Sequence, residues 1–255
     1  MVTPVLRSPI VLVHGFLGFD RVQMGAWTFA HYFRSIPEML RAAGNRVLLA
    51  RLNPIGGIAE RAAQLKTFLD AESPHEPVHL IGHSMGGLDC RYMISRLGMA
   101  PRVLSLTTLG TPHRGTAFAD WGVTRFSRLV CPVFEFFGLS YQAFKDLTTA
   151  RCKVFNAETP DAPGVRYFSV AGRFETDWLT PEWQLPAGII SRVEGANDGL
   201  VSLASAKWGE TCDIWDGDHM NLVNWTHPLA PTFRHSPDRS KEYAALVGRL
   251  ADAGF

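Results

Sequence analysis

The segment LIGHSMGG, residues 80–87, places one serine among three glycines. Apolar residues precede the serine and a helical pattern follows it, which is the strand–turn–helix setting of a G-x-S-x-G nucleophile elbow. Gly82 and Gly86 fit this setting because larger side chains would collide in so tight a turn. The helix N-terminus below the turn favours developing negative charge. We therefore predict that Ser84 is a nucleophile. The simpler alternative is a plain strand–helix joint, since isolated G-x-S-x-G matches arise by chance.

A serine hydroxyl becomes a good nucleophile when a histidine takes its proton and an acid orients that histidine. The chain has nine histidines. His219, in the segment DGDHMNLVNW, is selected because the chain order nucleophile, acid, histidine accompanies this type of elbow. His113, in LGTPHRG, follows a predicted strand and is a weaker rival. We predict that five further histidines shape the motifs or lie at core or surface positions: His14, His31, His75, His79 and His83.

The predicted acid is Asp198, in the segment ANDGLV. Asn-Asp-Gly is also a good tight-turn sequence in any protein, which is the alternative interpretation. Asp213, Asp216 and Asp218 are rivals that crowd His219, and Asp218 is an immediate neighbour that would have difficulty folding back to the same ring. Asp198 precedes His219 by 21 residues (219 − 198), which is enough chain for one loop to return.

Ester or amide chemistry also needs hydrogen-bond donors for the oxyanion of the tetrahedral intermediate. The backbone N–H of Met85, directly after the nucleophile, is one predicted donor. The other comes from the loop after the first predicted strand, where Gly15 permits the backbone bend and Phe16 offers its N–H.

Five motifs run in order over about residues 8–225: VHGFLG (13–18), GHSMGG (82–87), LGTPHRG (109–115), NDGLVS (197–202) and DHMNLVN (218–224). Together they resemble the bacterial lipases of the α/β-hydrolase superfamily. The resemblance implies a carboxylic-ester hydrolase, a triacylglycerol lipase or carboxylesterase, with Ser84, Asp198 and His219 as its triad. Two alternatives keep the triad, an acyltransferase and a polyester depolymerase. A third is a non-catalytic binding protein on the same fold.

The resemblance also bears on calcium. Secreted members usually carry an aspartate two places after the catalytic histidine, where it helps to bind a structural calcium, and this chain has Asn221 there. The second calcium aspartate would fall near Thr180, with Asp177 the nearest acid. An amide and one uncertain carboxylate make a poorer calcium site than two carboxylates. We expect no required metal or other cofactor.

Short apolar runs alternate with helical patterns, which predicts a mainly parallel sheet with helices on both faces, the α/β-hydrolase fold. Three patterns predict further helices. One is a capping-box pattern at Ser35 with Gly44 after it, the second is a helical hydrophobic period that begins at Ile58, and the third is Ser236-Pro237. No linker or repeat divides the chain, so residues 1–255 are interpreted as one domain. The predicted strands are Ile10–Val13, Arg46–Leu52, Val78–Ile81, Val103–Leu109 and Arg166–Val170.

One aromatic-rich stretch, from Phe118 to Phe144, interrupts this alternation. We interpret residues 115–150 as a lid or cap insertion that covers the active site in water and contacts a lipid interface transiently. The alternative is that its apolar face packs permanently on the core. Residues at helical spacing form that face, and Pro132 should kink the helix: Phe126, Leu129, Val130, Val133 and Phe137.

The composition limits the classes of partner that the protein is expected to bind. The 25 basic and 24 acidic residues are interspersed and leave a net charge of +1, so no basic stripe suggests nucleic acid. The N-terminus lacks the parts of a signal peptide, which fits a cytoplasmic protein or a secreted one whose signal has been removed. Four scattered cysteines form no C-x-x-C pair, and Cys90 is expected to be a buried thiol. An apolar ester or lipid is the expected substrate, and the oligomeric state is left open.

Overall fold

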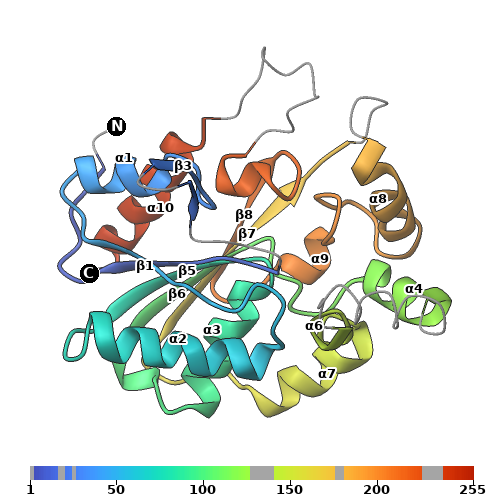
Figure 1. Ribbon diagram of the computed structural model, residues 1–255, viewed down its shortest axis with the longest axis horizontal. Helices are drawn as coiled ribbons and strands as arrows, with labels where there is room; N and C mark the ends of the chain where they lie inside the picture. The colour runs from blue at the N-terminus through green and yellow to red at the C-terminus, as the bar shows by residue number, and fades with distance from the viewer. Residues whose placement is uncertain (1–2, 17–20, 25–26, 127–140, 176–180, 226–237) are drawn as a thin grey trace.

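The computed structural model describes residues 3–16, 21–24, 27–126, 141–175, 181–225 and 238–255 (Figure 1). Within these residues the main sheet has six parallel strands in the order β4-β1-β5-β6-β7-β8. Their bounds are β1 (Ile10–Val13), β4 (Val47–Leu49), β5 (Val78–His83), β6 (Val103–Leu109), β7 (Arg166–Arg173) and β8 (Thr211–Asp216).

The five predicted strands are confirmed, and their ends differ from the prediction in three cases. β4 is shorter than predicted, whereas β5 and β7 continue further toward the site. β8 was not predicted from the sequence, and neither was a separate antiparallel hairpin formed by β2 (Arg21–Met24) and β3 (Trp27–His31). β8 is one of the two edge strands of the main sheet, and Trp215 is its one buried side chain.

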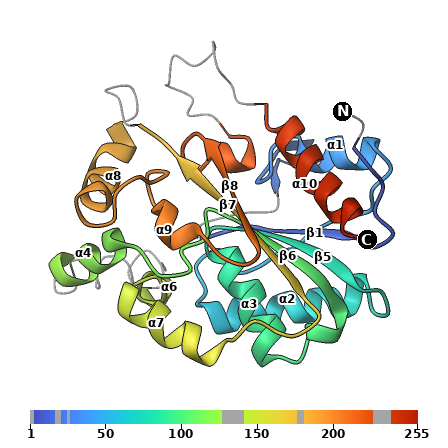
Figure 2. The same cartoon turned by 180° about the vertical axis from the view of Figure 1, so that it is seen from behind.

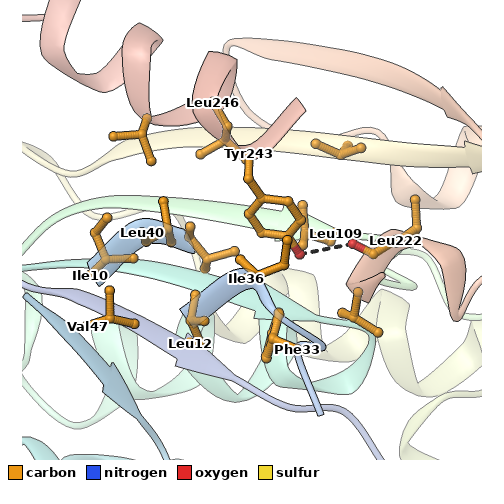
Figure 3. Close-up of a cluster of buried hydrophobic side chains, with 14 of the residues drawn as sticks. Ile10, Leu12, Phe33, Ile36, Leu40, Val47, Leu109, Leu222, Tyr243 and Leu246 are labelled. Atoms are coloured by element: carbon orange, nitrogen blue, oxygen red, sulfur yellow. Dashed lines mark hydrogen bonds between the residues drawn. The ribbon is translucent and has the colours of Figure 1, made fainter. Parts of the chain in front are cut away.

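Helices cover both faces of the sheet, as predicted (Figure 1). On one face α1 (Ile36–Ala42) and α10 (Ser240–Asp252) pack on Ile10 and Leu12, as Figure 3 shows. On the other face α2 (Ile58–Glu72) and α3 (Met85–Arg96) pack on Val11 and Val13. Successive residues of β1 therefore enter different cores, which is why the strand is a continuous apolar run.

The predicted capping box of α1 does not form. Ser35 has a φ of 60° and makes no side-chain hydrogen bond to the helix, whereas a capping serine has an extended backbone that aims its hydroxyl at the first turn. Gly44, predicted to lie at the end of this helix, has a φ of 96°. Ser236 and Pro237, predicted to open the last helix, lie outside the described residues, and α10 begins at Ser240.

Further helices of the described residues gather at the carboxyl ends of the strands (Figure 2). They are α4 (Ala117–Phe126), α6 (Tyr141–Asp146), α7 (Thr149–Glu158), α8 (Pro181–Val193) and α9 (Leu203–Ala206). The predicted lid, residues 115–150, includes α4 and α6, and its middle part, residues 127–140, lies outside the described residues. The lid therefore stays a prediction. Among the helices that the structure describes, none is both long and apolar enough to span a bilayer.

Candidate active site

Ser84 lies on a strained turn between β5 and α3, as predicted. Its φ of 54° and ψ of −129° are rare for a residue with a side chain. The flanking glycines have no room for one: a Cβ on Gly82 would lie 2.8 Å from the Cα of Gly87, and a Cβ on Gly86 would lie 2.6 Å from the carbonyl oxygen of Val13. The steric reason given for the G-x-S-x-G spacing is thus confirmed.

Asp198 and His219 form a buried hydrogen-bonded pair. The Nδ1 of His219 lies 2.8 Å from Oδ2 of Asp198, and the His219 backbone N–H donates to the Asp198 carbonyl at 2.7 Å. The second carboxylate oxygen accepts from the backbone N–H groups of Leu200 and Val201, at 3.0 and 2.8 Å. Because a carboxylate only accepts, Nδ1 carries the hydrogen and Nε2 is left free to take a proton.

Two strand ends leave space for this pair, and neither was predicted from the sequence. A Cβ on Gly110, which follows β6 and has a φ of 54°, would lie 2.8 Å from Oδ2 of Asp198 and 3.2 Å from Nδ1 of His219. A Cβ on Gly172, in β7, would lie 2.7 Å from Cβ of Asp198. Both positions lie at a close approach that only glycine fits.

The rival residues have other partners. His113 is fully buried, and its ring nitrogens contact Thr108 and Arg91. Asp218 accepts from the backbone N–H groups of the two residues that follow His219, so it shapes that loop. The two remaining rivals are in ion pairs with arginines: Asp213 with Arg249, and Asp216 with Arg173.

The loop that carries Phe16 approaches Ser84 closely. A Cβ on Gly15 would lie 2.8 Å from Cβ of Ser84 and 3.2 Å from the carbonyl oxygen of His83. Met85 is the first residue of α3. The two predicted oxyanion donors therefore belong to the two backbone segments that flank the serine.

A buried arginine, not identified from the sequence, fixes this loop. Arg61, in α2, is fully buried and donates from Nη2 to the His14 carbonyl at 2.6 Å and from Nη1 to the Asn53 carbonyl at 2.7 Å. Its Nε pairs with Oδ2 of Asp89, in α3, at 2.8 Å. Burial raises the pKa of Asp89 to about 7, and the neighbouring Arg61 opposes this rise. One guanidinium thus joins the loop after β1 to the helix that follows the serine.

An apolar cavity of about 260 Å³ opens at Ser84 and His219. α4, α6 and the loop after Asp198 contribute to its walls, with Phe118 and Phe144 among the lining residues. A cavity of about 360 Å³ between α2, α6 and α7 is larger, but Glu60, Asp146, Arg151 and Glu158 line it, and the serine does not. Of these two cavities, the smaller one combines an apolar lining with the candidate catalytic residues.

Of the residues implicated in calcium binding, the structure describes Asn221 alone. Asn221 uses its amide within the loop: Oδ1 accepts from the Asp218 N–H at 3.0 Å, and Nδ2 donates to the Trp225 carbonyl at 2.7 Å. Asp177 and Thr180 lie outside the described residues. The described part of the chain holds no group of three or more His, Cys, Asp or Glu side chains that could bind a metal ion.

The described cysteines, Cys90, Cys152 and Cys212, are free thiols, and Cys90 is buried as predicted.

A parallel sheet whose central strand turns into a helix through a strained serine is the arrangement of the α/β-hydrolase class. Solved structures agree at the level of the fold. A mature lipase of Bacillus licheniformis superposes with a TM-score of 0.74 at 22% identity, covering 96% of each chain. A lipase of Staphylococcus hyicus gives 0.73 at 19% identity, covering 97% of this chain and 96% of that one.

Sequence relatives are more specific. The triacylglycerol lipase 2 of Saccharomyces cerevisiae is 36% identical over 98% of this chain and 93% of its own length. A triacylglycerol lipase of Pseudarthrobacter phenanthrenivorans is 33% identical over 86% and 89%. The palmitoyl protein thioesterase family matches residues 9–125. The chain belongs to the lipase and esterase family of the α/β-hydrolase fold, and it is a carboxylic-ester hydrolase.

Proposed function

We propose that this protein hydrolyses esters of apolar acids, acylglycerols among them, through Ser84, His219 and Asp198 and an acyl-enzyme intermediate. The observation that carries the proposal is the buried Asp198–His219 hydrogen bond of 2.8 Å beside the apolar cavity that Ser84 also lines. The names of the relatives support the choice of triacylglycerol as a substrate.

In the proposed cycle, Nε2 of His219 takes the proton of Ser84 as the serine Oγ attacks the ester carbonyl carbon. Asp198 keeps the ring oriented and stabilises the imidazolium that forms. The proton then passes to the leaving alkoxide, and the alcohol departs from the acyl-enzyme. Water, deprotonated by the same histidine, attacks the acyl carbon, and the serine is released with the carboxylic acid.

The proposed oxyanion donors are the backbone N–H groups of Phe16 and Met85. Arg61 supports this role because it holds the His14 carbonyl two residues before Phe16. Preorganised donors of this kind stabilise charge that develops in the transition state. Because these donors belong to the main chain, side-chain substitutions test them poorly.

Turnover of a series of p-nitrophenyl esters and of triglyceride emulsions by the wild type and by Ser84→Ala tests the proposal. We expect the wild type to cleave apolar esters and the variant to lose several powers of ten in kcat. Equal turnover by both would contradict it. An added alcohol acceptor, a polyester film and an acyl thioester in the same series separate hydrolase activity from the acyltransferase, depolymerase and thioesterase alternatives.

We propose that the protein needs no metal, since both amide atoms of Asn221 are engaged within its loop. EDTA should leave the melting temperature and the activity unchanged, because an ion bound only to the folded state would stabilise it by mass action. A fall of several degrees on chelation that added Ca²⁺ reverses would overturn this expectation.

We also propose the lid over residues 115–150, with transient contact at a lipid interface. Activity on a short-chain ester should rise abruptly once the substrate exceeds its solubility and forms droplets. Replacing Phe134 and Phe137 with serine should reduce turnover of emulsions more than turnover of dissolved ester. Smooth saturation through the solubility limit would instead favour permanent packing of this segment.

A further inference from the structure

His83, directly before Ser84, lies in a hydrogen-bond chain that ends on the proposed base. The Tyr32 hydroxyl lies 2.7 Å from Nδ1 of His83, and Nε2 of His83 lies 3.0 Å from the backbone carbonyl oxygen of His219. The two imidazole rings are neighbours, with centroids 4.5 Å apart and planes inclined by 47°. All three residues are buried.

The chemistry of the partners sets the direction of both bonds. A carbonyl oxygen only accepts, so Nε2 of His83 carries the hydrogen and donates to His219. In the neutral ring Nδ1 then accepts, and the Tyr32 hydroxyl is the donor. Burial lowers the pKa of His83 well below its ordinary value, and the neighbouring His219 lowers it further. Tyr32 therefore selects the tautomer of His83 that can hold the His219 carbonyl.

We propose that Tyr32 and His83 are positioning residues that fix the main chain of His219, so that its Nε2 stays aimed at Ser84. The proposal rests on the proposed role of His219 as the base. It assigns two anchors to that residue: Asp198 holds the ring and the backbone N–H, and His83 holds the carbonyl.

The position of Tyr32 strengthens the case. Its hydroxyl also forms a hydrogen bond with the backbone of Gly15, and its side chain lines the cavity at Ser84. The chain of bonds thus runs from the loop of the proposed oxyanion donor to the loop of the proposed base. Without the hydroxyl, the Nδ1-protonated tautomer of His83 becomes accessible, and the lone pair on its Nε2 would then face the carbonyl oxygen of His219. That repulsion moves the base.

Tyr32→Phe tests this chain, with Tyr243→Phe as a matched control. Tyr243 is a fully buried tyrosine whose hydroxyl donates to the Leu222 carbonyl at 2.9 Å rather than to His83 (Figure 3). On a soluble p-nitrophenyl ester we expect Tyr32→Phe to lose roughly tenfold to a hundredfold in kcat with KM nearly unchanged, because a small misplacement of the base has effects of that size. Tyr243→Phe should lose thermal stability and keep the wild-type kcat.

A second pair of variants tests the bond to the carbonyl. His83→Gln keeps an amide N–H near the position of Nε2, so it should retain more than a tenth of the wild-type kcat, whereas His83→Leu should lose more than a hundredfold. The proposal is overturned if Tyr32→Phe keeps the wild-type kcat, if it raises KM alone, or if His83→Gln is no better than His83→Leu. Ser84→Ala, run beside them, separates the two questions: an active Ser84→Ala removes the proposed function, and an inactive one leaves the positioning role to be decided by these variants.

Discussion

At the scale of single residues, Ser84 combines a strained backbone with tight anchoring. A non-glycine residue in a sparsely populated conformation costs about 1–3 kcal/mol and persists only where its surroundings enforce it. Here the Ser84 N–H donates to the Leu109 carbonyl at 2.8 Å, and the Ser84 carbonyl accepts from the Thr111 hydroxyl at 2.8 Å. Bonds to β6 and the loop after it therefore hold both peptide groups of the serine in place.

At Gly110, one added methyl group should reduce activity by more than its effect on stability explains. Gly110→Ala places a Cβ 2.8 Å from Oδ2 of Asp198, in a backbone with a φ of 54°. Gly98, which follows the C-cap residue of α3 and has a φ of 71°, has nothing within 4 Å of the same atom. Both alanine variants should lose about 1–2 kcal/mol of stability from the left-handed backbone. Only Gly110→Ala should also lose kcat, by at least tenfold, in ester assays.

Equal kcat values for the two variants, after correction for the folded fraction by circular dichroism, would show that the contact of Gly110 with the Asp198–His219 pair has no part in turnover.

The residues proposed to carry the chemistry could be predicted from the sequence better than those that support them. Ser84, Asp198 and His219 stand in motifs with a recognisable order, and the structure brings them to one edge of the sheet. Arg61 and Gly110 stand in no such motif. Their importance comes from partners that are distant in the chain, such as Asp198 for Gly110, and only the folded arrangement reveals them.

At the scale of elements, acidic side chains fix the helices that line the cavity. Glu194, after α8, accepts from the Ala117 N–H at the start of α4, at 2.5 Å. Asp120, in α4, accepts from the Thr149 N–H at the start of α7, at 2.9 Å. Carboxylates at helix N-termini are favourable because they meet unpaired N–H groups and the positive end of the helix dipole. The cavity wall is therefore tied to the segment that carries Asp198.

Phe144, in α6, should set the preferred acyl length. It lines the cavity and packs edge-to-face on Phe118, with ring centroids 6.1 Å apart. Phe144→Ala should raise the ratio of kcat/KM for p-nitrophenyl dodecanoate over butyrate by roughly tenfold, since one methylene in an apolar pocket is worth about 1–3 kcal/mol.

Gly122→Ala should have the opposite effect on that ratio. Its Cβ would lie 2.5 Å from Cε1 of Phe144 and displace the ring toward the cavity. In a double variant that also carries Phe144→Ala, the alanine at 122 has no ring to displace, and the ratio should match that of Phe144→Ala alone. If neither single variant changes the ratio, the acyl chain binds elsewhere.

The elements that the sequence predicted well are those buried on both faces. β1 is a continuous apolar run, and β5 and β6 are buried along nearly their whole length, because helices cover both sides of the sheet. β8 has the sequence TCDIWD, in which Trp215 is the one buried residue, so neither an apolar run nor a clean alternation marks it. The capping box at Ser35 failed for a different reason, since the backbone there is left-handed and aims the hydroxyl elsewhere.

At the scale of the whole molecule, buried neutral histidines should set the pH below which the folded protein loses stability. Burial lowers the pKa of His79 to about 4, from an ordinary value of 6.5. As the pH falls below 6.5, His79 of the unfolded chain binds a proton, whereas His79 of the folded protein does not bind one until about pH 4. The free energy of unfolding therefore decreases between these two pH values.

His79→Asn should reduce this loss because it removes the titrating group and keeps a polar amide near the position of Nδ1, which lies 2.8 Å from the Ser105 hydroxyl. Urea unfolding at about pH 8 and about pH 5 should show a loss on acidification smaller by about 2 kcal/mol in the variant. His75→Gln, at an exposed position, is the control and should keep the wild-type pH dependence. The same acid loss in all three proteins would contradict the role of His79.

The central claim, that Ser84 is the nucleophile activated by His219, is tested most directly by covalent labelling. A fluorophosphonate probe reacts with an activated serine, and peptide mass spectrometry then locates the adduct. We expect one adduct, on the peptide that contains Ser84, formed in step with the loss of ester turnover. His219→Ala should slow its formation by several powers of ten. Full loss of turnover with the Ser84 peptide unmodified, or labelling that His219→Ala leaves unchanged, would contradict the account.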